Sequence, residues 1–199
     1  MATDHLDELV EAATSDRSTF AYTPVPADRA AMEAYVAKAL DRRRTGVHLP
    51  FVTRRLDDGR VVGSTRFYDL ETWDWSSSAP GPEDDRVRPG PDTAHIGYTW
   101  LVPGAQRTPV NTEAKLLMLG HAFEGWRSRV VRIQTDARNQ RSRRAIERLG
   151  CRLDGILRAD RPAVDGGVRD TAVYSMTADE WPVARNHLES RLSGSPIDG

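Results

Sequence analysis

Apolar positions recur along the chain with two different periods, and the switch between them predicts the order of helices and strands. Spacing of three and four residues predicts helices over residues 5–13, 28–43, 113–126, 139–150 and 179–192. Alternating patterns and runs of β-branched or aromatic residues predict strands over residues 49–56, 60–70, 95–102, 129–136, 151–158 and 168–176. This order predicts an α/β protein with a mixed sheet: three antiparallel strands, a strand-helix-strand-helix unit and a closing hairpin.

Two stretches fall outside these elements. Residues 72–93 shift in composition to Trp, Ser, Pro, Gly, Asp and Arg, which predicts a long loop. We interpret residues 76–91 as a surface insert, and Trp73 and Trp75 as anchors of a lid or a dimer contact. Residues 193–199 are expected to form a frayed tail. The length of 199 residues fits a single domain, which we place over residues 1–199.

The segment between the strand at residues 95–102 and the helix at residues 113–126 is the first candidate site. A loop that enters a helix N-terminus presents free backbone N–H groups and the positive end of the helix dipole, which favour an anion. A helix capped by Asn111 or Thr112 explains the same pattern. The spacing alone therefore leaves a phosphate site and a polar surface turn open. The polar side chains of the loop are Gln106, Arg107, Thr108, Asn111 and Thr112.

The predicted helix over residues 139–150 carries the second candidate site. Asn139 is placed to cap its start, and Gly150 is placed to end it. Ser142 shares the inward face of this helix with apolar residues. A hydroxyl in such a place needs a hydrogen-bond partner. Ser142 therefore either bonds a backbone carbonyl or faces a ligand.

Together these segments resemble the GNAT superfamily of acyl-CoA-dependent N-acyltransferases. The most specific strings are NTEAKLL at residues 111–117, TDARN at residues 135–139 and EWP at residues 180–182, and the resemblance extends from about residue 26 to residue 181. The pattern is most similar to the branch that acetylates the N-terminal alanine amines of ribosomal proteins. It implies the GNAT fold, a mostly antiparallel mixed sheet with splayed central parallel strands. The first edge strand of that fold is either missing here or truncated.

The resemblance also implies roles for individual residues. Ser142 matches a serine that protonates the leaving thiolate in the ribosomal branch. The backbone of Leu101 and Val102 would line the pantetheine arm of coenzyme A, and the 3'-phosphate would meet Arg144. Tyr98 and Trp100 would shape the acyl or acceptor pocket, unless they belong to the core. The other implied cofactor contacts are Gln106, Arg107, Thr108, Val110, Asn111, Thr112 and Asn139.

Two residues depart from the family pattern. Pro109 stands where the family has glycine, and losing a charge-assisted N–H bond to phosphate would cost roughly 1.5 to 3 kcal/mol. His95 stands where relatives have a glutamate that acts as a base through water. Deprotonating an α-amine of pKa about 8 at pH 7 costs about 1.4 kcal/mol, whereas a lysine amine costs about 4.6. His95, or water alone, is thus adequate for an α-amine. An ordinary strand residue is the alternative for His95.

Composition narrows the class of protein. The 28 basic and 29 acidic residues give a net charge of -1, so no broad basic field indicates nucleic acid or an anionic membrane as a partner. The sequence has no bilayer-spanning apolar run and no signal-peptide pattern. Its single cysteine excludes an intrachain disulfide, which favours a cytoplasmic protein. The five histidines lack metal-ligand spacing, so no metal site is predicted.

The sequence therefore predicts an enzyme that transfers an acetyl group from acetyl-CoA to a primary amine by direct attack. The acceptor is expected to be an α-amine of a protein, peptide or small molecule. Another donor such as succinyl-CoA stays open, because an arginine near the cleft could pair with its carboxylate. The alternative is a non-catalytic acyl-CoA-binding or scaffold protein, which Pro109 and His95 favour. A homodimer is an expectation from the resemblance alone.

Overall fold

The computed structural model describes residues 1–75 and 88–194. Within them, six strands form one mixed sheet in the order β1-β2-β3-β4-β6-β5. β3 and β4 are parallel, and all other neighbours are antiparallel. This arrangement confirms the predicted α/β fold. The strands are β1 (His48–Arg54), β2 (Val61–Glu71), β3 (Thr93–Leu101), β4 (Val130–Asp136), β5 (Arg152–Pro162) and β6 (Val168–Thr177).

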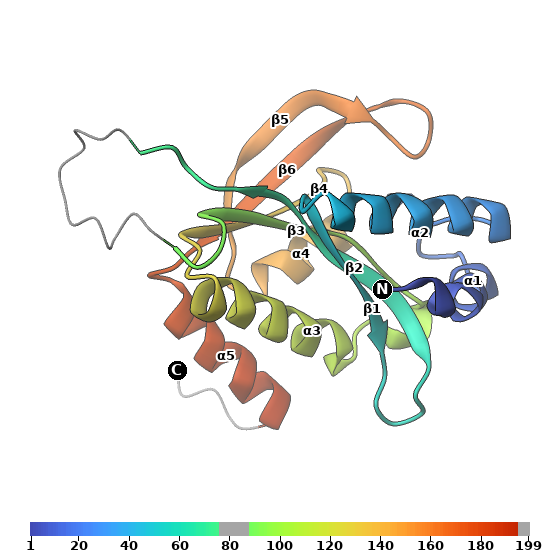
Figure 1. The fold of residues 1–199 in the computed structure, drawn as a ribbon, viewed down its shortest axis with the longest axis horizontal. Coiled ribbons are helices and arrows are strands. Elements are labelled where there is room, and N and C mark those ends of the chain that lie inside the picture. The colour runs from blue at the N-terminus through green and yellow to red at the C-terminus, as the bar shows by residue number, and fades with distance from the viewer. Residues whose placement is uncertain (76–87, 195–199) are drawn as a thin grey trace.

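Helices cover both faces of the sheet (Figure 1). α1 (Leu6–Ser15) and α2 (Arg29–Arg44) pack on one face, in a core cluster that includes Val61 and Trp100 of the sheet. α3 (Pro109–Gly120), α4 (Gln140–Glu147) and α5 (Trp181–Ser193) pack on the other, in a cluster that includes Phe67 and Ile133. Three short turns complete the described elements: η1 (Thr3–His5), η3 (Pro103–Ala105) and the π-helical η4 (His121–Gly125).

The two parallel strands separate after a short paired stretch. β3 and β4 pair only from Thr93 opposite Val130 to Ile96 opposite Ile133, although both strands continue further. Opposite β2, β3 contains one extra residue between Gly97 and Trp100, and Tyr98 there has a left-handed φ of 52°. Such a bulge bends its strand. The divergence agrees with the splayed strands that the resemblance implied.

The predicted helix over residues 113–126 was placed too late along the chain. α3 begins at Pro109, and the Thr108 side chain caps it by accepting a hydrogen bond from the Val110 amide. A proline at the first helical position fits because its missing N–H has no intrahelical partner there. Asn111 and Thr112 therefore lie in the first turn and do not cap the helix. After Gly120 the helix continues as the π-helical η4 instead of a regular α-helix.

Several predictions concern the margins of the fold. Trp73 and Trp75 contact each other with ring centroids 5.7 Å apart, and the Arg129 guanidinium lies 4.8 Å over Trp75.

Most of the predicted insert, at residues 76–87, and residues 195–199 of the predicted tail lie outside the described residues. In the described part of the chain β1 pairs with β2 alone. No helix within residues 1–75 and 88–194 has the length and apolar character needed to cross a membrane.

Candidate active site

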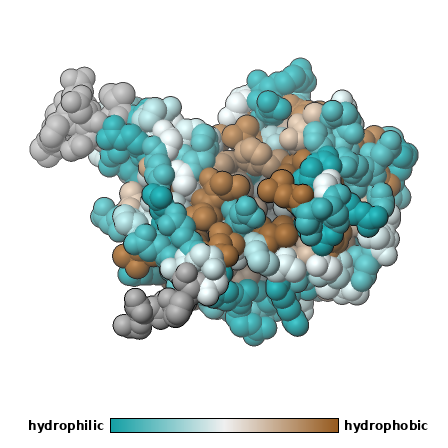
Figure 2. Space-filling view, turned by 90° about the horizontal axis from the view of Figure 1, so that it is seen from below, coloured by the Kyte–Doolittle hydropathy of each residue, from teal (hydrophilic) through white to brown (hydrophobic). Residues whose placement is uncertain are grey.

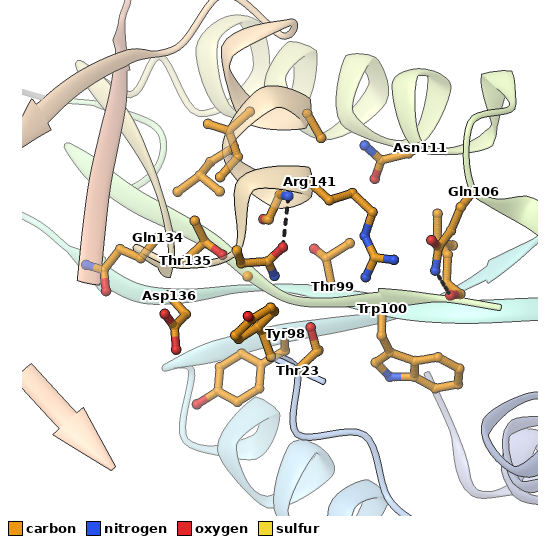
Figure 3. A pocket seen from close by; sticks show the side chains of 18 of the residues that line it. Thr23, Tyr98, Thr99, Trp100, Gln106, Asn111, Gln134, Thr135, Asp136 and Arg141 are labelled. Atoms are coloured by element: carbon orange, nitrogen blue, oxygen red, sulfur yellow. Dashed lines mark hydrogen bonds between the residues drawn. The ribbon is translucent and has the colours of Figure 1, made fainter. Parts of the chain in front are cut away.

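A cavity of about 900 Å³ lies where β3 and β4 diverge. Its wall includes the ends of both strands, the start of α3, the face of α4, the turn before α2 and the β5–β6 hairpin. Figure 3 shows Gln106 and Asn111 towards one end of the cavity, Gln134 and Asp136 towards the other, and Thr99 between them. Seen from below, the surface is hollowed near the middle, where apolar side chains gather (Figure 2). The volume suits a substrate-sized ligand.

The end near α3 is suited to an anion. The helix starts at the cavity wall, so its positive dipole end faces the cavity. Arg107 lies just before it with a left-handed φ of 61°. Burial and the nearby charge of Arg107 both lower the pKa of Arg141. Neither guanidinium has an ion-pair partner among residues 1–75 and 88–194. Two such neighbouring cations can pair with the oxygens of an anion.

Hydrogen bonds fix the shape of this end. The Gln106 side-chain amide donates to the Leu101 carbonyl at 2.8 Å and to the Thr19 hydroxyl at 2.7 Å. Arg141 donates to the backbone carbonyl of Thr19. The turn that contains Thr19 is therefore tied to both the α3 loop and α4. Because its N–H donors are occupied, Gln106 orders the loop rather than offering a free donor.

Ser142 stands at the start of α4. The Asn139 side chain caps this helix, and its carbonyl oxygen accepts a hydrogen bond from the Ser142 amide at 3.1 Å. Both residues line the cavity. The Ser142 hydroxyl has no hydrogen-bond partner among the described residues. The predicted alternative, a hydroxyl bonded to a backbone carbonyl, is therefore absent there, and the hydroxyl is available to a ligand.

Lys115 of α3 also reaches the cavity wall, although only 3% of its surface is exposed. Its ammonium donates to the hydroxyls of Thr65 at 2.8 Å and Thr99 at 2.9 Å. No carboxylate pairs with it in the part of the chain that the structure describes. Burial lowers the pKa of Lys115 to about 7. Lys115 is thus a buried amine that exchanges its proton near neutral pH.

The opposite end of the cavity is aromatic and cationic. Tyr68 and the half-exposed Tyr98 form one wall, with ring centroids 5.3 Å apart. Arg161 and Arg169 of the β5–β6 hairpin form another. Across the described residues, the cavity wall contains eight cationic side chains and one acidic side chain, Asp136. An excess of positive charge in a concave site favours a polyanionic ligand.

Known proteins of the same fold identify the chain. A family model for the acetyltransferase (GNAT) domain matches residues 1–152. The chain belongs to the GNAT acetyltransferase family. Together with the acetyltransferases among its structural neighbours, this makes it an acyl-CoA-dependent N-acetyltransferase. A comparison with curated proteins gives no significant match.

Three solved structures illustrate the likeness. A GCN5-related N-acetyltransferase from Brucella melitensis is 27% identical, with a TM-score of 0.79 over 100% of this chain and 82% of that one. A protein from T. thermophilus that was assigned as an acetyltransferase is 31% identical, with a TM-score of 0.73 over 96% and 90%. RimJ of Mycobacterium smegmatis, in complex with CoA-disulfide, is 20% identical and shares the fold, with a TM-score of 0.75 over 96% and 86%.

The GNAT cavity brings together most of the site residues predicted from the sequence. Three of them do not line it. His95 contacts Tyr68 and Gln134, which do line the cavity. Val102 and Val110 pack in a small apolar cluster beside the cavity. The predicted residues on the cavity wall are Tyr98, Trp100, Leu101, Gln106, Arg107, Thr108, Asn111, Thr112, Asn139, Ser142 and Arg144.

The sequence interpretation missed several residues of this GNAT site, Arg141 among them. Lys115 lies within a helix and one residue before an apolar run, and a lysine there is ordinarily exposed. Tyr68, Arg161 and Arg169 lie on strands whose register decides which side chains meet. For Arg169 the strand pattern offered a signal. Side chains alternate along a strand, so Arg169 lies on the side opposite to the buried Ala172 and Tyr174. No comparable signal marks Lys115.

Proposed function

We propose that the protein transfers an acetyl group from acetyl-CoA to the α-amine of a protein, peptide or small molecule, by direct attack of the amine. The observation that carries this proposal is the Ser142 hydroxyl, which lines a cationic cavity and has no partner among the described residues. The motif resemblance to enzymes that acetylate ribosomal protein N-termini supports the same class of acceptor.

The residues of the cavity fit coenzyme A. Its pyrophosphate needs cations and N–H donors, which Arg107, Arg141 and the start of α3 supply. Asn139 keeps its side-chain N–H donors free of partners in the described chain. The RimJ structure holds a CoA-disulfide and shares the fold, which supports this placement. Arg144 lines the cavity and stays our prediction for the 3'-phosphate.

Pro109 no longer favours a degenerate site. It occupies the first position of α3, where its fixed φ suits the helix, and the Val110 amide is already capped by Thr108. Side chains therefore have to supply part of the phosphate binding that backbone amides supply in a glycine-rich loop. Arg107, Asn111 and Thr112 lie on the cavity wall for this purpose.

The chemistry assigned to the chain is proton transfer and orientation. The bound thioester supplies the acyl carbon and a thiolate leaving group. Ser142 donates its hydroxyl proton to the leaving sulfur, and the proton released by the amine nitrogen restores the hydroxyl through water. The products are an amide and the free thiol. Tyr68 and Tyr98 form the wall against which the acceptor amine is oriented.

The base is the least demanding part of this scheme. Burial lowers the pKa of His95, so its imidazole is neutral at pH 7. Because His95 does not line the cavity, it would accept a proton through water. An α-amine of pKa about 8 needs little help at neutral pH, whereas a lysine amine needs much more. His95 therefore stays our prediction for an auxiliary base.

A test of this function compares two acceptors with the full-length protein. Acetyl-CoA is supplied with a C-terminally amidated peptide that has a free α-amine, or with an Nα-acetylated peptide that contains lysine. We expect CoA release with the first peptide and a mass increase of one acetyl group at its N-terminus. Faster acetylation of the lysine peptide at pH 7 would contradict the proposal. A cytoplasmic location, a homodimer and one domain over residues 1–199 stay predictions.

A further inference from the structure

The β5–β6 hairpin places two arginines directly opposite each other. Arg161 of β5 pairs in register with Arg169 of β6, and both line the cavity. Like charges at directly opposed positions destabilise a β-ladder. Burial and the charge of Arg161 both lower the pKa of Arg169, in agreement with this repulsion. The chain therefore holds two positive charges together at a cost to its own stability.

A bulge in β5 creates this pair. Between Leu157 and Arg161, β5 advances four residues while β6 advances two, from Thr171 to Arg169. Ala159 in the bulge adopts a left-handed φ of 50°, which is unfavourable for a residue with a Cβ atom. Its amide is held by the Asp170 side chain at 2.9 Å. Bulges re-aim side chains, and this one aims Arg161 at the cavity.

One carboxylate serves both arginines. The Arg161 Nε atom lies 2.5 Å from Asp160 Oδ2, which also accepts a hydrogen bond from the Thr171 hydroxyl at 2.7 Å. Arg169 Nε donates to that hydroxyl at 3.0 Å. The two Nε atoms are thus fixed by Asp160 directly or through Thr171. Of the terminal nitrogens, only Nη2 of Arg161 has a described partner, Gln134 at 3.4 Å.

The carboxylate on the described cavity wall, Asp136, does not bond either arginine of the hairpin. Asp136 is held by Arg138 through hydrogen bonds of 3.0 Å and 2.8 Å, from Nε and Nη2, and Arg138 also pairs with Asp165 at 2.7 Å. Both terminal nitrogens of Arg169 and Nη1 of Arg161 therefore have no partner among the described residues. The two oxygens of a carboxylate match such terminal nitrogens of guanidinium groups.

This end is separate from the phosphate end. On β6, the side chains of Ala172 and Tyr174 are buried in the cluster with α3, α4 and α5. Strand alternation turns Arg169 and Thr171 to the other face of the sheet. Arg107, Arg141 and Ser142 belong to the α3–α4 side, and Figure 3 shows Gln134, the contact of Arg161, distant from Gln106 and Asn111. The arginine pair thus meets a different part of the reacting molecules.

We propose that Arg161 and Arg169 form a carboxylate-binding subsite that holds a carboxylate of one of the two reactants, either the amine acceptor or the transferred acyl group. The subsite rests on the proposed N-acyltransferase function and names the feature that its substrate carries. In the first case the substrate is an N-terminal segment that carries an acidic side chain. In the second it is a dicarboxylic acyl thioester.

The experiment uses the full-length protein, Arg169→Gln and Arg158→Gln. Arg158 is an exposed residue of β5, the strand that carries Arg161, and it does not line the cavity, so its replacement is a matched change of charge. The acceptor arm supplies acetyl-CoA with the amidated peptides Ala-Asp-Ala and Ala-Asn-Ala, which share the same α-amine. The donor arm supplies succinyl-CoA or butyryl-CoA with Ala-Asn-Ala. Calorimetric binding of each peptide to the CoA-saturated protein, and of each acyl-CoA to the free protein, accompanies the kinetics.

We expect wild type to prefer the carboxylate-bearing member in one arm, and Arg169→Gln to lower its kcat/KM by about 10- to 100-fold through KM. In Arg169→Gln the kcat/KM for the neutral substrate of the same arm should change less than about twofold. Arg158→Gln should have the kcat/KM of wild type for both substrates. Arg169→Lys should recover part of the kcat/KM that Arg169→Gln loses. The arm that responds identifies the carboxylate. No preference in either arm, in kinetics or binding, overturns the subsite. Absence of turnover with every pair overturns the proposed function instead, and the binding data still decide the subsite.

Discussion

The two ends of the cavity both concentrate positive charge, but the chain builds them in different ways. The end near α3, which we propose binds the phosphates of the donor, comes from a loop and two helix starts, so most of its groups are placed by their own sequence neighbours. The arginine end comes from strand register and a bulge that bring Arg161 and Arg169 together. The first construction suits a donor that many enzymes share. The second can change with one hairpin and leave the phosphate contacts intact, which suits a determinant of substrate choice.

Ser142→Ala removes the proposed acid and should have the largest effect. We expect kcat to fall about 100-fold or more, in the range typical of general acid catalysis. The dissociation constant of acetyl-CoA should change less than about threefold, because the hydroxyl acts on the leaving sulfur. Steady-state kinetics and calorimetry measure the two effects. A variant that keeps more than a third of wild-type kcat would exclude Ser142 as the acid.

Lys115→Met tests the buried charge of α3. The pKa of Lys115 is about 7 in the folded protein, against about 10.4 when unfolded. Between these values the unfolded state binds more protons, so the free energy of unfolding rises with pH. We expect the deprotonation of Lys115 to raise the free energy of unfolding of wild type by about 2 kcal/mol from pH 7 to pH 9. This contribution should be absent in Lys115→Met.

Lys38→Met is the control for that measurement, because Lys38 is exposed on α2. Chemical denaturation of all three proteins at pH 7 and pH 9 gives the comparison. Equal pH dependence in wild type and Lys115→Met would refute the buried, titrating lysine.

His95→Gln should have the smallest effect. We expect the pH profile of kcat/KM to rise towards pH 8 with the α-amine of the acceptor, in both wild type and the variant. The plateau value of kcat/KM in His95→Gln should be less than about tenfold below that of wild type, because His95 lies behind residues that line the cavity. If the inflection of the wild-type profile lies below pH 6.5 and disappears in the variant, His95 is instead the principal base.

The elements around the α3–α4 end of the cavity were predicted from the sequence because their signals are local. Asn139 capping α4, the strand that precedes α3 and the placement of Ser142 all follow from short-range patterns. The start of α3 was wrong because the apolar periodicity begins later than the helix. The pair Thr108 and Pro109, which carried the cap and first-turn signal, was interpreted as part of the loop.

The arginine side could not be predicted because it depends on register. The bulges at Tyr98 and Ala159 are defined only relative to their partner strands. A shift of one residue would turn Arg169 to the core side. The buried environment of Lys115 likewise depends on Thr65 and Thr99, which come from two different strands. Such contacts follow from assembly and not from spacing along the chain.

Titration of the free protein with acetyl-CoA tests most directly which end of the cavity binds the donor. Calorimetry on wild type, Arg107→Gln and Arg169→Gln compares one arginine from each end. Losing a charge-assisted contact to phosphate should weaken binding about tenfold in Arg107→Gln, whereas Arg169→Gln should bind acetyl-CoA within about twofold of wild type. Equal weakening in both variants, or an effect in Arg169→Gln alone, would contradict the assignment of the donor to the α3–α4 end.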